Sequence, residues 1–197
     1  MATRVRSQRG EGERLRTALL DAAAELLGES HDVDSLSIRA VTARAGVSPT
    51  ALYLHFADKA ALTRAVRERC YEALGADLRA AQAEHDGDPR EQLLAMGNAY
   101  LRFAREQPGQ YAILFETYVP KPGLPPITPG DRGHAVLDLV LSTVALIVED
   151  ETAAFETACL AWMALHGRAA IHAAMPTFPF PADDRFVEVL VDRCVGN

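Results

Sequence analysis

The chain has few of the features that mark exported, membrane-spanning or metal-binding proteins. Only 3 of its 197 residues are cysteine. Cys70, Cys159 and Cys194 are scattered, odd in number and without metal-ligand spacing, which suits free thiols in a reducing cytoplasm. The longest apolar run, residues 139–148, is too short to span a bilayer. Residues 1–10 are polar and basic, unlike a signal peptide. We therefore expect a soluble, cytoplasmic protein with no membrane partner, metal or cofactor.

Common catalytic motifs are also missing. The sequence has no phosphate-binding glycine loop, no Gly-x-Ser-x-Gly and no paired ligand motif on a helix. His85, Asp86 and Asp88 lie in one turn and could attract a metal ion, but a polar loop tip explains them more simply. His166 and His172 are six residues apart and face different ways on a helix. We expect a protein that is not an enzyme; an enzyme and a protein-binding helical module are the alternatives.

The pattern of apolar residues predicts an all-α protein of about nine helices. Leu and Ala dominate, β-branched runs are short, and no alternating pattern persists. Residues 119–133 hold five prolines and three glycines and predict an irregular loop. The predicted helices span about residues 11–28, 37–45, 49–55, 59–84, 89–107, 110–118, 134–149, 151–174 and 184–195.

Charge is divided unevenly along the chain. The formal net charge is −7. Residues 1–69 hold eleven Lys or Arg against nine Asp or Glu, whereas residues 70–197 hold nine against eighteen. Arg4, Arg6 and Arg9 lie in a first segment without any acid. A basic end on an acidic body orients a molecule on a polyanion, so we expect this arm to enter a DNA minor groove. A solvated tail is the alternative, and both can hold.

Residues 36–62 predict a helix-turn-helix. Ser37 can cap the first helix, and Gly46 can end it in a left-handed conformation. Ser48 can cap a second helix that begins at Pro49. The apolar face that joins the two helices consists of Leu36, Ile38, Val41, Ala45, Val47 and Leu52. The side chains left outward on the second helix are Thr50, Ala51, Tyr53, Leu54 and His55. Such a face fits a DNA major groove.

This segment resembles the DNA-binding domain of the tetracycline-repressor (TetR) family of bacterial transcription regulators. The matching residues are AGVS at 45–48, LYLHF at 52–56, Lys59 and Leu62. The amphipathic helix at 18–29 stands where the family places its first helix, and the resemblance covers about residues 14–69. Thr42 stands where the family usually has alanine under the turn, and its methyl group can fill that space.

The resemblance implies roles for individual side chains. Tyr53, His55 and Lys59 match phosphate-contacting positions of the family, although a half-buried ring packed on the first helix is the alternative for Tyr53. Thr50 and Ala51 can read base edges, with Arg39 reaching in from the preceding helix. The complete predicted DNA-binding set is Arg4, Arg6, Arg9, Ser37, Arg39, Ser48, Thr50, Ala51, Tyr53, His55 and Lys59. For Arg44 we expect a solvated surface position.

The C-terminal part contains Trp162, His166 and Gly167 in a W-x-x-x-H-G pattern. It resembles the WHG-type ligand-binding and dimerisation domain of some TetR-like regulators. The predicted ligand pocket is lined by Met96, Tyr100, Phe103, Tyr111, Phe115, Trp162 and His166, and ordinary core packing is the alternative for each. The predicted dimer stripe is Val187, Leu190, Val191 and Cys194, in a four-helix bundle of two helices from each chain.

The domain and function predictions follow from this resemblance. Residues 1–58 would form the arm and DNA-binding domain, 59–84 a connecting helix, and 85–197 the ligand-binding and dimerisation domain. The resemblance implies a homodimeric repressor that binds a palindromic operator in double-stranded DNA. A small apolar or amphipathic effector would shift the helix at 89–107 and thereby spread the two DNA-reading heads. Activation in place of repression stays open, because it depends on where the operator lies.

Overall fold

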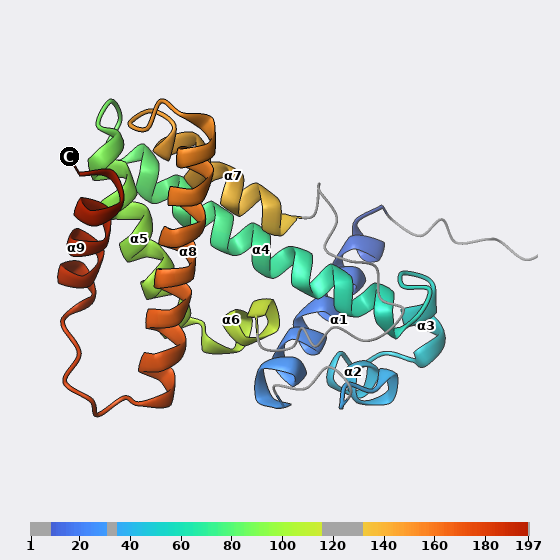
Figure 1. Cartoon of the computed structure of the whole chain (residues 1–197). Helices are drawn as coiled ribbons and strands as arrows, with labels where there is room; N and C mark the ends of the chain where they lie inside the picture. The colour runs from blue at the N-terminus through green and yellow to red at the C-terminus, as the bar shows by residue number, and fades with distance from the viewer. Residues whose placement is uncertain (1–8, 31–34, 116–131, 197) are drawn as a thin grey trace, which may run out of the picture. The chain divides into compact units, whose positions relative to one another are not determined.

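The computed structural model describes residues 9–30, 35–115 and 132–196, and every regular element in these ranges is an α-helix (Figure 1). The all-α prediction is therefore confirmed. The elements are α1 Arg9–Ser30, α2 Ile38–Arg44, α3 Pro49–Tyr53, α4 Lys59–Ala83, α5 Pro89–Glu106, α6 Pro108–Phe115, α7 Arg132–Val144, α8 Glu151–Ala174 and α9 Asp183–Val195. Most of the loop predicted at 119–133 lies outside the described residues. Within them, no helix is long and apolar enough to cross a bilayer.

The chain divides into two compact units. The N-terminal unit comprises residues 1–69 and 109–120, and the C-terminal unit comprises residues 70–108 and 121–197. Helix α4 therefore contributes to both units, and nearly all of α6 belongs to the N-terminal one. The reason for the latter is a close backbone approach: a Cβ on Gly28 of α1 would lie 3.2 Å from the Cα of Gly109 in α6. The domain boundaries after residues 58 and 84 stay predictions.

The N-terminal unit is built on a small aliphatic core. Its fully buried side chains include Leu19, Leu27, Val41, Leu52 and Leu62. They come from α1, α2, α3 and α4, and α2 packs against both α1 and α3. Burying each such side chain contributes about 1.5–3 kcal/mol of transfer free energy. This core fixes the orientation of the short helix α3.

Helix α5 is the centre of the C-terminal unit and packs against α7, α8 and α9 (Figure 1). Its contact with α9 depends on Gly97. A Cβ at that position would lie 2.7 Å from Cγ1 of the fully buried Val187. Glycine therefore lets α9 lie closer to α5 than any other residue would allow.

Helix α7 ends earlier than the apolar pattern predicts. The sequence predicts a helix to about residue 149, but α7 stops at Val144 and residues 145–147 form turns. The amide of Leu146 donates to Thr143 O, and that of Ile147 donates to Val144 O, both with the tighter spacing of a turn. Asp150 then caps α8 by accepting from the amide of Ala153 at 2.8 Å. The apolar pattern continues to Val148 although the helix ends at Val144, so periodicity alone misplaces this boundary.

The predicted dimer stripe on α9 faces its own unit. Val187 and Val191 are buried within the chain, and Leu190 and Cys194 are half-buried. Burial also raises the pKa of the Cys194 thiol. The three-and-four spacing correctly marks an apolar face, but that face packs on α5 of the same chain. Val187 and Val191 therefore serve packing within the chain, and the role of the stripe in a dimer stays a prediction.

Candidate nucleic-acid interface

The turn between α2 and α3 has the local structure that its sequence predicts. Ser37 Oγ accepts from the amide of Ala40 at 3.1 Å and caps α2. Gly46 has φ +70°, a conformation that glycine adopts without steric cost. The amide of Val47 donates to the carbonyl of Thr42 at 2.9 Å. The buried Thr42 hydroxyl donates to Ile38 O at 2.9 Å, so threonine fits where alanine is usual.

Helix α3 is anchored on one side and exposed on the other. Ser48 Oγ accepts from the amide of Ala51 at 3.2 Å, and Pro49 opens the helix. Leu52 has no exposed surface, whereas 55% of Tyr53 and 79% of Leu54 are exposed. Thr50 is exposed and Ala51 half-buried. The exposed tyrosine argues against the half-buried alternative for its ring.

The remaining side chains of the predicted phosphate set lie where helices meet. His55 is half-buried beside α1, because a Cβ on Gly12 would lie 3.8 Å from its Cε1 atom. Lys59 is the first residue of α4 and is half-buried. Asp58 precedes it and accepts from the amide of Ala61 at 2.7 Å. Asp58 therefore occupies one of the amides at the start of α4, so the attraction for a phosphate at this end falls mainly to the ammonium of Lys59.

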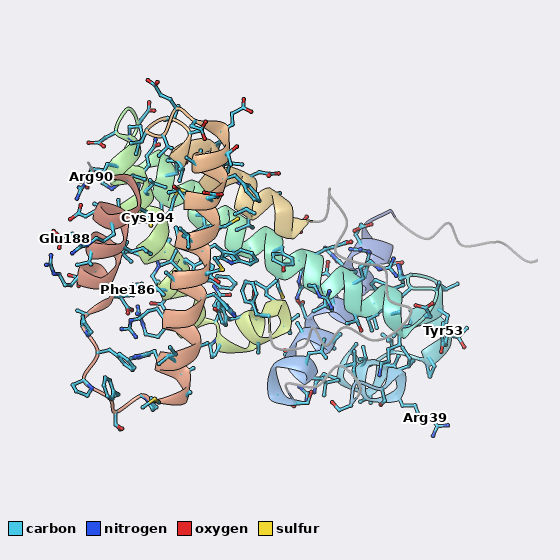
Figure 2. The ribbon with its side chains drawn as sticks, in the orientation of Figure 1. Arg39, Tyr53, Arg90, Phe186, Glu188 and Cys194 are labelled. Carbon is cyan, nitrogen blue, oxygen red and sulfur yellow. The ribbon has the colours of Figure 1, made fainter. Side chains whose placement is uncertain are left out.

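The two arginines of α2 have different surroundings. Arg44 contacts Glu25 at 2.9 Å and Glu29 at 3.2 Å, and its hydrogen bonds to Glu29 and Glu25 raise its pKa. Arg44 thus joins α2 to α1. Arg39 is exposed and extends away from the ribbon, as does Tyr53 (Figure 2). Arg39 is therefore the arginine of α2 that can reach DNA.

The basic arm is only partly described. Arg4 and Arg6 lie outside the described residues, and Arg9 is the first residue of α1. The sequence analysis missed Arg16, whose guanidinium carbon lies 5.4 Å from the centroid of the Phe56 ring. Phe56 belongs to the LYLHF run. An arginine one or two turns into the first predicted helix is the sequence feature that could have indicated this contact. This pair packs α1 against the segment that follows α3.

The predicted ligand-pocket residues fall in both units. Met96, Tyr100 and Phe103 are buried on α5, and Tyr111 is buried on α6 with its ring 4.9 Å from that of Phe115. His166 is half-buried on α8. The pocket stays a prediction.

Trp162 belongs to an exposed apolar surface instead. We call this surface the outer face of α8; its members are Phe155, Leu160, Trp162, Met163 and Ile171, each 40% exposed or more. A Cβ on Gly167 would meet nothing within 4 Å, so the backbone is also open beside this face. Trp162 is thus partly open to a protein contact, and its place in the ligand pocket stays a prediction.

The loop with His85, Asp86 and Asp88, which could attract a metal ion, contains the cap of helix α5. Asp88 Oδ1 accepts from the amides of Arg90 and Glu91, both at 3.1 Å, and so caps α5. No group of three His, Cys, Asp or Glu side chains able to hold a metal ion occurs among the residues that the structure describes.

Family models match both halves of the chain. Residues 19–66 match the model of bacterial regulatory proteins of the tetR family. Residues 93–194 match the model of the tetracyclin repressor-like C-terminal domain, the kind of domain that the W-x-x-x-H-G pattern suggested. A comparison with curated proteins found no match.

Solved structures share the fold over nearly the whole chain. A protein of unknown function from Rhodococcus sp. RHA1 is 29% identical, with a TM-score of 0.72 over 91% of this chain and 93% of its own. A protein assigned to the TetR family of transcriptional regulators from Vibrio parahaemolyticus is 21% identical, with a TM-score of 0.70 over 90% and 96%. The fatty acid degradation regulator FadR from Bacillus halodurans is 12% identical, with a TM-score of 0.67 over 91% and 94%. With a capped helix-turn-helix in the first half and family matches in both, the chain belongs to the TetR family of transcriptional regulators.

Proposed function

We propose that the protein is a homodimeric repressor that binds a palindromic operator and releases it when a small apolar or amphipathic effector binds. The observation that carries this proposal is the exposure of α3. Its base-reading candidate Thr50 and its phosphate-contact candidate Tyr53 are exposed on a helix that Ser48 caps and Leu52 anchors. A rigid helix with hydrogen-bonding groups on its free side suits a major groove.

Dimerisation is supported by the size of α3. The helix has only five residues, so the DNA-binding unit of one chain can contact few bases. Tight binding to an operator therefore requires the DNA-binding unit of a second chain. In a two-fold dimer the heads read two half-sites, which makes the operator a palindrome.

The outer face of α8 is our proposed dimer surface. Several large apolar side chains exposed on one helix mark a protein contact more often than a solvated surface does. We expect Met163→Glu to give a monomer in sedimentation equilibrium. Leu146→Glu is the matched control, since Leu146 is also exposed but lies between α7 and α8. If the Met163→Glu variant stays dimeric while the Leu146→Glu variant becomes monomeric, the dimer interface does not lie on α8.

Effector release is proposed through α5 and α4. The α5 side chains Met96, Tyr100 and Phe103 form a buried apolar row with one hydroxyl, a composition that suits an amphipathic molecule. Helix α4 runs from the DNA-binding unit into the C-terminal unit as one continuous element, so a shift of its C-terminal half alters its N-terminal half. Family and fold are those of transcriptional regulators, and the proposed place of action is the cytoplasm, where DNA is accessible.

The test is selection of bound duplexes from a random pool by the purified protein at near-physiological salt. We expect a palindrome with two half-sites spaced by about one helical turn. The doubly changed Thr50→Ala, Tyr53→Phe variant is the matched control, since both side chains are exposed and their loss leaves the fold intact. No enrichment by a folded wild-type dimer, or the same enrichment by this variant, would contradict the proposal.

A further inference from the structure

A buried arginine lies where α8 connects to α9. Arg168 on α8 is 8% exposed. Its Nη2 donates to Pro181 O at 3.0 Å and to Asp183 Oδ1 at 2.8 Å. Its Nε and Nη1 are buried and have no hydrogen-bond partner. Buried polar groups are nearly always paired in folded proteins, and an unpaired cationic donor is costly, so these N–H groups call for an acceptor.

Asp183 also pairs with a second arginine. One of its carboxylate oxygens accepts from Arg168, and the other accepts from Arg105 Nη1 at 2.7 Å. Arg105 has a further carboxylate nearby, since its Nη2 lies 3.7 Å from Glu106 Oε1. Both oxygens of Asp183 are therefore engaged, and the buried Nε and Nη1 of Arg168 have no partner among the described residues.

Aromatic rings surround the same guanidinium. Its central carbon lies 5.1 Å from the ring centroid of Phe180 and 5.9 Å from that of Phe186. Phe178 extends this group, with its ring 4.4 Å from that of Phe180, and half of its surface is exposed. The connection from α8 to α9 thus supplies an apolar surface that reaches from the buried cation to solvent.

A second unpaired polar atom lies one turn further along α8. His172 Nδ1 is buried without a hydrogen-bond partner, and its ring is 6.3 Å from that of Phe180. Residues four apart share a helix face, with Cβ atoms about 5–6 Å from each other. In the tautomer that carries its proton on Nδ1, His172 offers a neutral donor on the same side as Arg168.

We propose that Arg168 and His172 bind the carboxylate of an amphipathic acid beneath the connection between α8 and α9. One carboxylate oxygen accepts from an unpaired N–H of Arg168 and the other from His172 Nδ1. The apolar part lies against Phe178 and Phe186 once Phe180 has moved off the guanidinium. This site is separate from the α5 row of the proposed function, and its binding of an acid does not depend on that function.

The test is calorimetric titration of the full-length wild-type protein with decanoate and decanol, without DNA. We expect decanoate to bind at least about tenfold more tightly than decanol, as a charged hydrogen bond implies. Arg168→Met should weaken decanoate about tenfold or more and leave decanol unchanged. Arg185→Met is the matched control: it removes an exposed cation of α9 that pairs with Glu188, and it should bind decanoate like wild type.

Folding of each variant is checked by its melting curve. If Arg168→Met does not fold, Arg168→Lys and His172→Phe replace it, and each should weaken decanoate selectively. The proposal is overturned if decanoate and decanol bind equally well, if neither binds, or if the folded variants keep the wild-type affinity. Water would then be the acceptor for the unpaired N–H groups of Arg168. Operator binding by the ligand-free wild type, measured separately, reports on the proposed function alone.

Discussion

Helices α3 and α8 both expose a face to solvent, but the two faces differ in chemistry. Helix α3 is short and shows a hydroxyl and a phenol, with the exposed Leu54 directly after it, on a backbone held by a serine cap. Helix α8 has 24 residues and shows large apolar side chains beside an open glycine. The first face can exchange hydrogen bonds with a hydrated groove, and the second gains free energy only by leaving water. Exposure alone therefore does not identify the kind of binding surface. The chemistry of the exposed side chains distinguishes a DNA contact from a protein contact.

Two leucines in and beside α3 separate anchoring from reading most sharply. Leu52→Ala removes a fully buried side chain and should lower the free energy of unfolding by about 2–5 kcal/mol. Leu54→Ala removes an exposed side chain and should change it by no more than about 0.5 kcal/mol. Urea denaturation measures both. Equal losses would mean that α3 is not seated as described.

The next largest effect on stability is expected where α5 packs on α9. Gly97→Ala forces a methyl group into contact with Val187 and should destabilise the C-terminal unit by about 1–3 kcal/mol. Gly12→Ala in α1 meets only an ordinary contact with His55 and should stabilise by about 0.5–1 kcal/mol. Thermal unfolding followed by circular dichroism compares the two. A harmless Gly97→Ala would place α9 further from α5.

Base reading and phosphate binding can be separated on α3 and α4. Thr50→Ala should lose about 1–3 kcal/mol of discrimination at one base position. Lys59→Ala should weaken all duplexes alike and lower the slope of log affinity against log salt by about 1. Fluorescence anisotropy on matched and singly mismatched duplexes measures both. Uniform weakening by Thr50→Ala would remove it from the reading set.

The caps of the helix-turn-helix should give the smallest effect. Ser48→Ala frees the amide of Ala51 and should cost about 1 kcal/mol of stability. Ser48→Asp retains an acceptor and should restore most of that loss, although its charge would oppose DNA. The contrast between unfolding midpoint and DNA affinity in these two variants separates capping from direct contact. Full stability in Ser48→Ala would show that the cap is dispensable.

The N-terminal unit could be predicted closely because its determinants are local. Ser37, Gly46 and Ser48 specify caps and a turn from their own chemistry, and each has the predicted geometry. The alternative for Tyr53 could not be decided from sequence, because exposure depends on the packing of α1.

The C-terminal unit was predicted less well because its determinants are distant in sequence. The spacing of Val187 and Val191 identifies an apolar face, but spacing does not say whether α5 or a second chain covers it. Arg168 and Asp183 are fifteen residues apart and meet only because the chain folds back between α8 and α9. No pattern of neighbouring residues in the sequence predicts such a pair.

The central claim is that two α3 helices, paired by a dimer, read one operator. It is tested most directly by measuring the affinity of the purified protein for the selected full palindrome and for a duplex that carries one half-site, across a range of salt concentrations. We expect the full site to bind at least about a hundredfold more tightly, with a steeper dependence on salt because more phosphates are contacted. Equal affinities and equal slopes on the two duplexes would contradict the account.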